Sequence, residues 1–130
     1  MTDRPIRIVL DASAIVAYAR GSIDVGETIG EVNDDGATVG LPVLSLIEAN
    51  RVVVAKDWPD NLLDHEATAV LDVDGSDWRA LAAMYDTIDP LDAASAALAT
   101  IDYRCPVLTS RPAQYGATRA ADWVITLPPE

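Results

Sequence analysis

The chain has 130 residues, the length of one ordinary domain, and its single cysteine excludes an internal disulfide. No apolar run reaches the roughly 18 residues that a membrane-spanning helix needs, and the first residues carry no secretory signal, so we expect a cytoplasmic protein without a membrane partner. The 9 basic and 21 acidic side chains give a net charge of −12, which argues against binding of duplex nucleic acid mainly through phosphate neutralisation.

The first part of the chain predicts two strands and three helices. Ile6 to Leu10 is a short apolar run, Asp11 closes it, and Ala12 and Ser13 continue a helix-start signal. The Asn, Asp and Gly residues at positions 33–36 end a later helical pattern. In chain order the predicted elements are a strand over residues 6–10, helices over 12–19 and 22–32, a strand over 37–41 and a helix over 42–54.

The remainder of the chain predicts three further strands and two further helices. Residues 58–66 are polar and contain proline, which is typical of a loop with one helical turn. Asp89 and Pro90 mark the start of an alanine-rich helix. The predicted elements are a strand over residues 69–73, helices over 76–88 and 91–101, a strand over 107–109, a turn over 110–116 and a strand over 123–127.

The order of these elements indicates an α/β fold. Strands alternate with helices, and the strands are apolar throughout rather than at every second residue. That pattern predicts a parallel sheet covered by helices on both faces. No internal repeat or low-complexity linker divides the chain, so we expect a single domain over residues 1–130.

Three acidic residues occupy positions where sites form in parallel sheets. Asp11 ends the first strand, Glu48 lies in the helix after the second, and Asp92 opens the helix that leads to the fourth. Sites of such sheets form beyond the carboxyl ends of the strands. Crowded carboxylates repel one another unless a cation neutralises them, and oxygen ligands favour Mg²⁺ or Mn²⁺. The three acids therefore predict metal-assisted hydrolysis of a phosphodiester.

Each acid also has a structural interpretation. Asp11 could cap the helix that starts at Ala12. Glu48 could be a solvated helix residue paired with Arg51, three positions later. Asp92 could be a first-turn acid that the helix dipole favours.

Four motifs, taken in order, resemble the PIN-domain family, which includes VapC-type toxins. The first reads Ile-Val-Leu-Asp-Ala-Ser-Ala-Ile-Val-Ala-Tyr over residues 8–18, and the second reads Leu-Ser-Leu-Ile-Glu-Ala over residues 44–49. The third reads Pro-Leu-Asp-Ala-Ala-Ser-Ala-Ala-Leu-Ala over residues 90–99, and the fourth reads Val-Leu-Thr-Ser over residues 107–110. The resemblance spans nearly the whole chain and rests on the order and spacing of the motifs together.

The resemblance implies a three-layer α/β/α sandwich with a central parallel sheet of about five strands, and an endoribonuclease that uses Mg²⁺ or Mn²⁺. It carries metal-ligand and catalytic roles onto Asp11, Glu48 and Asp92, and supporting roles onto the hydroxyls of Ser13 and Thr109. The implied partners are an RNA substrate and, for a toxin, a small antitoxin whose basic tail can block the acidic site. Members of the family are often dimers, so a homodimer is compatible with the resemblance.

One position departs from the family pattern. Where the family usually has a fourth acid, in a sequence such as Thr-Ser-Asp-Pro, residues 109–112 read Thr-Ser-Arg-Pro. Arg111 could pair with Asp92 or Asp11 and occupy the place of the metal, or it could point outward and contact a phosphate. Two other acids could substitute for the missing one: Asp102 and Asp122.

Three functions are compatible with these features. The first is a metal-dependent ribonuclease, as the toxin of a toxin–antitoxin pair, in which Asp11, Glu48 and Asp92 hold the ion. The second is a degenerate PIN fold that has lost activity through Arg111 and binds an arginine-bearing peptide in its acidic groove. The third is a phosphatase or flap-type DNA nuclease, which the short chain and the scarcity of basic residues disfavour.

Overall fold

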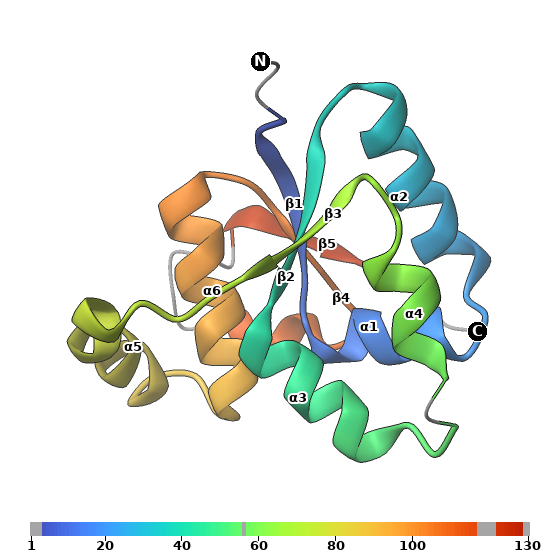
Figure 1. Cartoon of the computed structure of the whole chain (residues 1–130). Helices are drawn as coiled ribbons and strands as arrows, with labels where there is room; N and C mark the ends of the chain where they lie inside the picture. Colours follow the sequence, from blue (N-terminus) through green and yellow to red (C-terminus); the bar gives the residue numbers. More distant parts are fainter. Residues whose placement is uncertain (1–3, 56, 117–121, 129–130) are drawn as a thin grey trace.

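A computed structural model of the chain describes residues 4–55, 57–116 and 122–128. It contains one parallel sheet of five strands in the order β3-β2-β1-β4-β5 (Figure 1). The strands are β1 (Ile6–Leu10), β2 (Thr38–Pro42), β3 (Thr68–Leu71), β4 (Val107–Thr109) and β5 (Val124–Thr126). The predicted parallel sheet is thereby confirmed.

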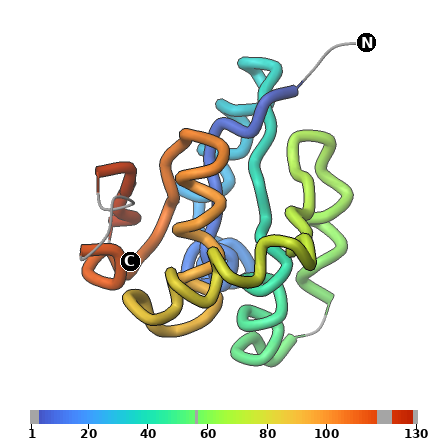
Figure 2. The backbone as a smooth tube through the Cα atoms, turned by 90° about the vertical axis from the view of Figure 1, so that its left-hand side faces the viewer, coloured from blue at the N-terminus to red at the C-terminus, as the bar shows by residue number. Residues whose placement is uncertain are grey.

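Helices cover both faces of the sheet, which gives the three-layer α/β/α arrangement. On the right of the sheet in Figure 1 lie α1, α2 and α4, and on the left lie α5 and α6. Figure 2 shows α6, in orange, in front of the strands. The helices are α1 (Ala12–Ala19), α2 (Ile23–Asp34), α3 (Val43–Val52), α4 (Trp58–Leu63), α5 (Trp78–Tyr85) and α6 (Leu91–Tyr103), with 3₁₀ turns η1 (Gly75–Asp77) and η2 (Pro112–Tyr115).

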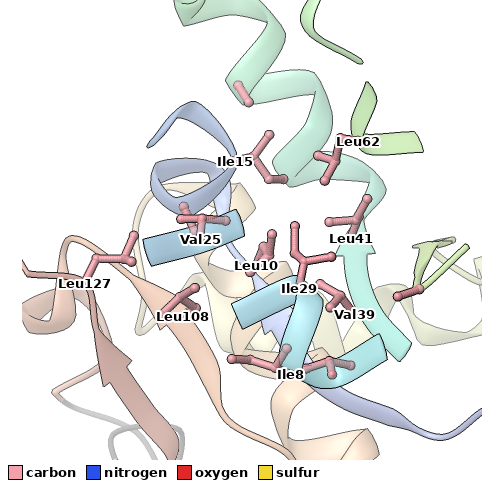
Figure 3. Close-up of a cluster of buried hydrophobic side chains, with 14 of the residues drawn as sticks. Ile8, Leu10, Ile15, Val25, Ile29, Val39, Leu41, Leu62, Leu108 and Leu127 are labelled. Atoms are coloured by element: carbon pink, nitrogen blue, oxygen red, sulfur yellow. The ribbon is translucent and has the colours of Figure 1, made fainter. Parts of the chain in front are cut away.

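The alternation of side chains along β1 divides the core into two clusters. Successive residues of a strand point to opposite faces. Ile8 and Leu10 join the larger cluster beneath α1, α2 and α4, where Figure 3 shows them among the side chains of Ile29 and Leu41. Val9 points the other way and packs with the alanines of α6 in the second cluster. Both faces of the central strand are therefore buried, as expected for an internal parallel strand.

The strand order reverses beside β1. The chain passes from β1 to β2 and β3 on one side, then returns to place β4 and β5 on the other side. Val9 and Leu10 pair with Val107 and Leu108 of β4. Asp11 and Thr109 therefore stand together at the switch point, where ligand sites of doubly wound sheets form.

The predicted elements differ from the structure mainly at their ends. Pro42 is the last residue of β2 as well as the cap of α3, because its backbone is extended. The predicted loop at residues 58–66 contains α4, a helix of six residues whose Trp58 and Leu62 are buried. The sequence predicts one helical turn in this loop, and packing of these two side chains stabilises a helix of six residues. None of the helices in the described part of the chain is long and apolar enough to cross a membrane.

Candidate functional site

A pocket of about 520 Å³ lies at the carboxyl ends of β1, β4 and β5. Side chains from α1, α3 and α6 and from the segment after β4 line it. Glu48 and Asp92 are its acidic lining residues, and Ser13, Ser110 and Arg111 are among its polar ones. The structure therefore brings residues from five separate parts of the sequence to one cavity.

Asp11 lies behind the pocket wall and is only 1% exposed. Its Oδ1 accepts hydrogen bonds from the backbone N–H of Ala14 at 3.0 Å and from the hydroxyl of Ser13 at 2.6 Å. Its Oδ2 accepts a hydrogen bond from the hydroxyl of Tyr115 at 2.7 Å. The interpretation of Asp11 as a helix cap is thus confirmed, and the carboxylate is at the same time the centre of a buried polar network.

Ser13 and Thr109 connect the start of α1 to the end of β4. Their hydroxyl oxygens are 3.2 Å apart. The backbone N–H of Ser110 donates to the Ser13 hydroxyl at 2.9 Å, and that of Arg111 donates to the Thr109 hydroxyl at 2.9 Å. The two hydroxyls hold the start of α1 against the end of β4 and the segment after it.

Asp92 lies in the first turn of α6, lines the pocket and is 7% exposed. Its Oδ2 accepts a hydrogen bond from the backbone N–H of Ala12 at 3.3 Å. Burial raises the pKa of Asp92 to about 6, and the negative charges of Asp11 and Glu48 add to the rise. The charged form of Asp92 is therefore less favourable than that of an ordinary carboxylate, and a cation in the pocket would stabilise it.

Glu48 lines the same pocket from α3 but is paired with Arg51. Arg51 donates from Nε at 3.1 Å and from Nη2 to the two carboxylate oxygens. This hydrogen bonding lowers the pKa of Glu48, and the charge of Arg111 lowers it further. The pairing interpretation of Glu48 is confirmed, although the side chain also faces the cavity.

The carboxylate oxygens that line the pocket suit a hard divalent cation bound by few protein ligands. Asp92 and Glu48 present carboxylates to the cavity, and the repulsion among Asp92, Asp11 and Glu48 is the charge that such an ion relieves. Within residues 4–55, 57–116 and 122–128, no group of three or more His, Cys, Asp or Glu side chains is close enough to hold an ion. Since Mg²⁺ usually keeps several waters, one or two carboxylates are a sufficient protein contribution.

Arg111 lines the pocket near Glu48, whose pKa its charge lowers. Among the described residues its guanidinium forms no ion pair with Asp92 or Asp11, so the pairing that would occupy the place of the metal is absent there. Asp102 lines a different cavity, of about 100 Å³, and is not a substitute for the missing acid.

Tyr115 is the residue of the site that the sequence did not reveal. It is fully buried in η2, and burial together with the charge of Asp11 raises the pKa of its hydroxyl, which therefore stays protonated as a donor. The hydrogen bond joins residues 104 positions apart. A tyrosine in a predicted turn carries no local signal for such a contact.

The family comparison agrees with this arrangement. The family model described as PIN domain matches residues 8–111. The matched segment contains Asp11, Glu48 and Asp92 and ends at Arg111. No curated protein matches the chain at a significant level. With four fifths of its length matched, and with the parallel sheet and switch-point pocket described above, the chain belongs to the PIN domain family, a nuclease family whose members generally depend on divalent metal ions.

Proposed function

We propose that the protein is a metal-dependent endoribonuclease of PIN type that hydrolyses RNA phosphodiester bonds. The observation that carries the proposal is the state of Asp92. Its carboxyl lines a pocket at the switch point, and burial and two neighbouring acids raise its pKa to about 6. Among the described residues Asp92 accepts a hydrogen bond from the backbone N–H of Ala12 but has no basic partner, and its carboxyl faces the pocket.

Asp92 and Glu48 would hold Mg²⁺ or Mn²⁺ from the cavity side, with Asp11 adding its charge from behind the wall. The ion would supply an activated water and positive charge for the phosphate. The other groups act by positioning. Tyr115 and Ser13 hold the Asp11 carboxylate in one orientation, and the contact between Ser13 and Thr109 holds the start of α1 against the end of β4.

A role as the toxin of a type II toxin–antitoxin pair is the finer form of the proposal. A net charge of −12 and two carboxylates in the cavity would attract a small antitoxin with a basic tail. An arginine of that tail would compete with the metal for Asp92, which would couple inhibition to loss of the ion.

A degenerate PIN fold that binds an arginine-bearing peptide is the second candidate. Two observations favour it: Arg51 already pairs with Glu48, and Arg111 adds positive charge to the cavity. Both weaken a cation site without filling it.

Titration of Mn²⁺ into the metal-stripped protein, beside an RNA cleavage assay, tests the proposal. We expect saturable binding and Mn²⁺-dependent cleavage by the natural chain, and loss of both in Asp92→Asn. The control is Asp86→Asn, the same substitution at an exposed carboxylate at the end of α5. Binding and cleavage equal in the two variants would refute the role of Asp92. Absence of Mn²⁺ binding that Arg111→Asp restores would favour the degenerate fold.

The pair between Glu48 and Arg51 provides a smaller prediction. Arg51→Ala should raise the Mn²⁺ affinity about twofold, because an exposed pair at this spacing is weak and its loss frees the Glu48 carboxylate. The midpoint of urea unfolding should stay unchanged, since Arg51 is on the surface. Arg79→Ala, at an arginine that stacks on Trp78, is the control. A weaker Mn²⁺ affinity in Arg51→Ala would show that the arginine supports Glu48 as a ligand.

A further inference from the structure

Two of the nine basic side chains of this acidic protein line the same pocket as Asp92 and Glu48. Arg20 caps the carboxyl end of α1, and Arg111 lies in the segment after β4. Positive charge opposes the binding of a metal ion. The carboxylate site therefore does not account for the presence of two arginines in this cavity.

Neither guanidinium contributes an interaction that the fold needs. In the part of the chain that the structure describes, Arg20 and Arg111 form no side-chain hydrogen bond and no ion pair. Most other arginines have partners: Arg4 donates to Asn33 and Ala37, Arg7 and Arg51 pair with acids, and Arg79 stacks on Trp78. Arg104 also lacks a partner among the described residues, but it does not line the pocket.

The surroundings of the two arginines suit an anion. Ser110 and Gln114 line the same cavity and carry hydroxyl or amide donors. Guanidinium groups bind phosphate oxygens through two parallel hydrogen bonds and remain charged at every relevant pH. Guanidinium groups in this position would bind the phosphates of a nucleic acid backbone, while the neighbouring carboxylates would hold the metal ion.

We propose that Arg20 and Arg111 form a phosphate-binding subsite, which holds phosphodiester groups of single-stranded RNA next to the carboxylate site. This proposal rests on the proposed ribonuclease function and gives Arg111 a role in place of the missing acid. It also explains how a chain with a net charge of −12 retains a polyanion. Positive charge is supplied locally at the pocket while the remaining surface repels nucleic acid.

Binding of a fluorescent single-stranded RNA, measured by anisotropy in EDTA at several salt concentrations, tests the subsite without cleavage. Arg20→Gln and Arg111→Gln should each weaken binding and lower the slope of log affinity against log salt by about 0.7, the value per phosphate contact on a single strand. The double variant should lower the slope by about 1.4. Arg104→Gln is the matched control, since it removes the same charge from an unpaired arginine outside the pocket.

Each outcome separates the subsite from the nuclease. The subsite is overturned if Arg20→Gln and Arg111→Gln show the same salt slope as Arg104→Gln, or if the natural chain binds no RNA. This conclusion holds even where Mn²⁺-dependent cleavage is present. A lowered slope with no cleavage would uphold the subsite and reject the nuclease. An acidic peptide that displaces the RNA and binds more tightly through the same two arginines would replace RNA with a protein ligand and overturn the proposal. Mn²⁺ binding should not weaken in Arg111→Gln, because the arginine is not a ligand.

Discussion

Asp11→Ala should lower the free energy of unfolding by about 2–4 kcal/mol, a large effect for one polar residue. The substitution removes the acceptor for Ala14 at the start of α1, which alone is worth about 1 kcal/mol. It also leaves the buried hydroxyl of Tyr115 without its acceptor on Asp11, at a cost of about 1–3 kcal/mol. Urea unfolding at neutral pH measures the change.

Two further variants show which contact dominates. Asp11→Asn keeps an acceptor for Ala14 and should cost about 1–2 kcal/mol, and Tyr115→Phe should cost a similar amount. The double variant Asp11→Asn, Tyr115→Phe should cost less than the sum of the two, because both remove the same hydrogen bond. Additive losses, or a loss under 1 kcal/mol in Asp11→Ala, would show that the network does not stabilise the fold. Activity assays should therefore use Asp11→Asn, since Asp11→Ala confounds chemistry with unfolding.

Asp92→Asn should make the protein more stable at pH 8 while it abolishes Mn²⁺ binding. The folded-state pKa of Asp92 is raised to about 6 from an ordinary value near 4, so the folded protein binds the proton more tightly than the unfolded chain. Stability from this group is fully present below about pH 4 and is lost as the pH rises through about 6. The Asn variant carries no such charge and should gain on the order of 1–3 kcal/mol at pH 8.

Urea unfolding of both proteins from pH 4 to pH 8 tests this effect. The difference in stability between variant and natural chain should grow across pH 4–6 and then level off, because Asp92 is ionised above that range. Asp86→Asn should run parallel to the natural chain. Curves for Asp92→Asn that also run parallel would mean that the carboxyl titrates normally. Addition of Mn²⁺ should stabilise the natural chain and leave Asp92→Asn unchanged, since an ion that binds only the folded state stabilises it.

The fold was largely predictable because its signals are local. Apolar runs such as the one in β1 and the helix-start residues after it depend on neighbours within a few positions, and the structure confirms β1 and α1 at their predicted bounds. The differences lie where packing adds to the local signal. In α4 the sequence predicts one helical turn, and the buried side chains of Trp58 and Leu62 stabilise a helix of six residues. The family match over residues 8–111 confirms the resemblance that the ordered motifs indicated.

The sequence by itself indicated the candidate carboxylates, because Asp11, Glu48 and Asp92 lie at or after the ends of predicted strands or at the start of a predicted helix. The strand order brings the ends of β1 and β4 and the start of α6 together, and Asp92 accepts a hydrogen bond from Ala12, the residue after Asp11. Only the tertiary structure decided the protonation and pairing of these groups. Tyr115 reaches Asp11 across 104 residues, and Arg111 forms no ion pair with the acids among the described residues. Such contacts depend on the distances and burial that arise when the layers pack, which no periodicity along the chain records.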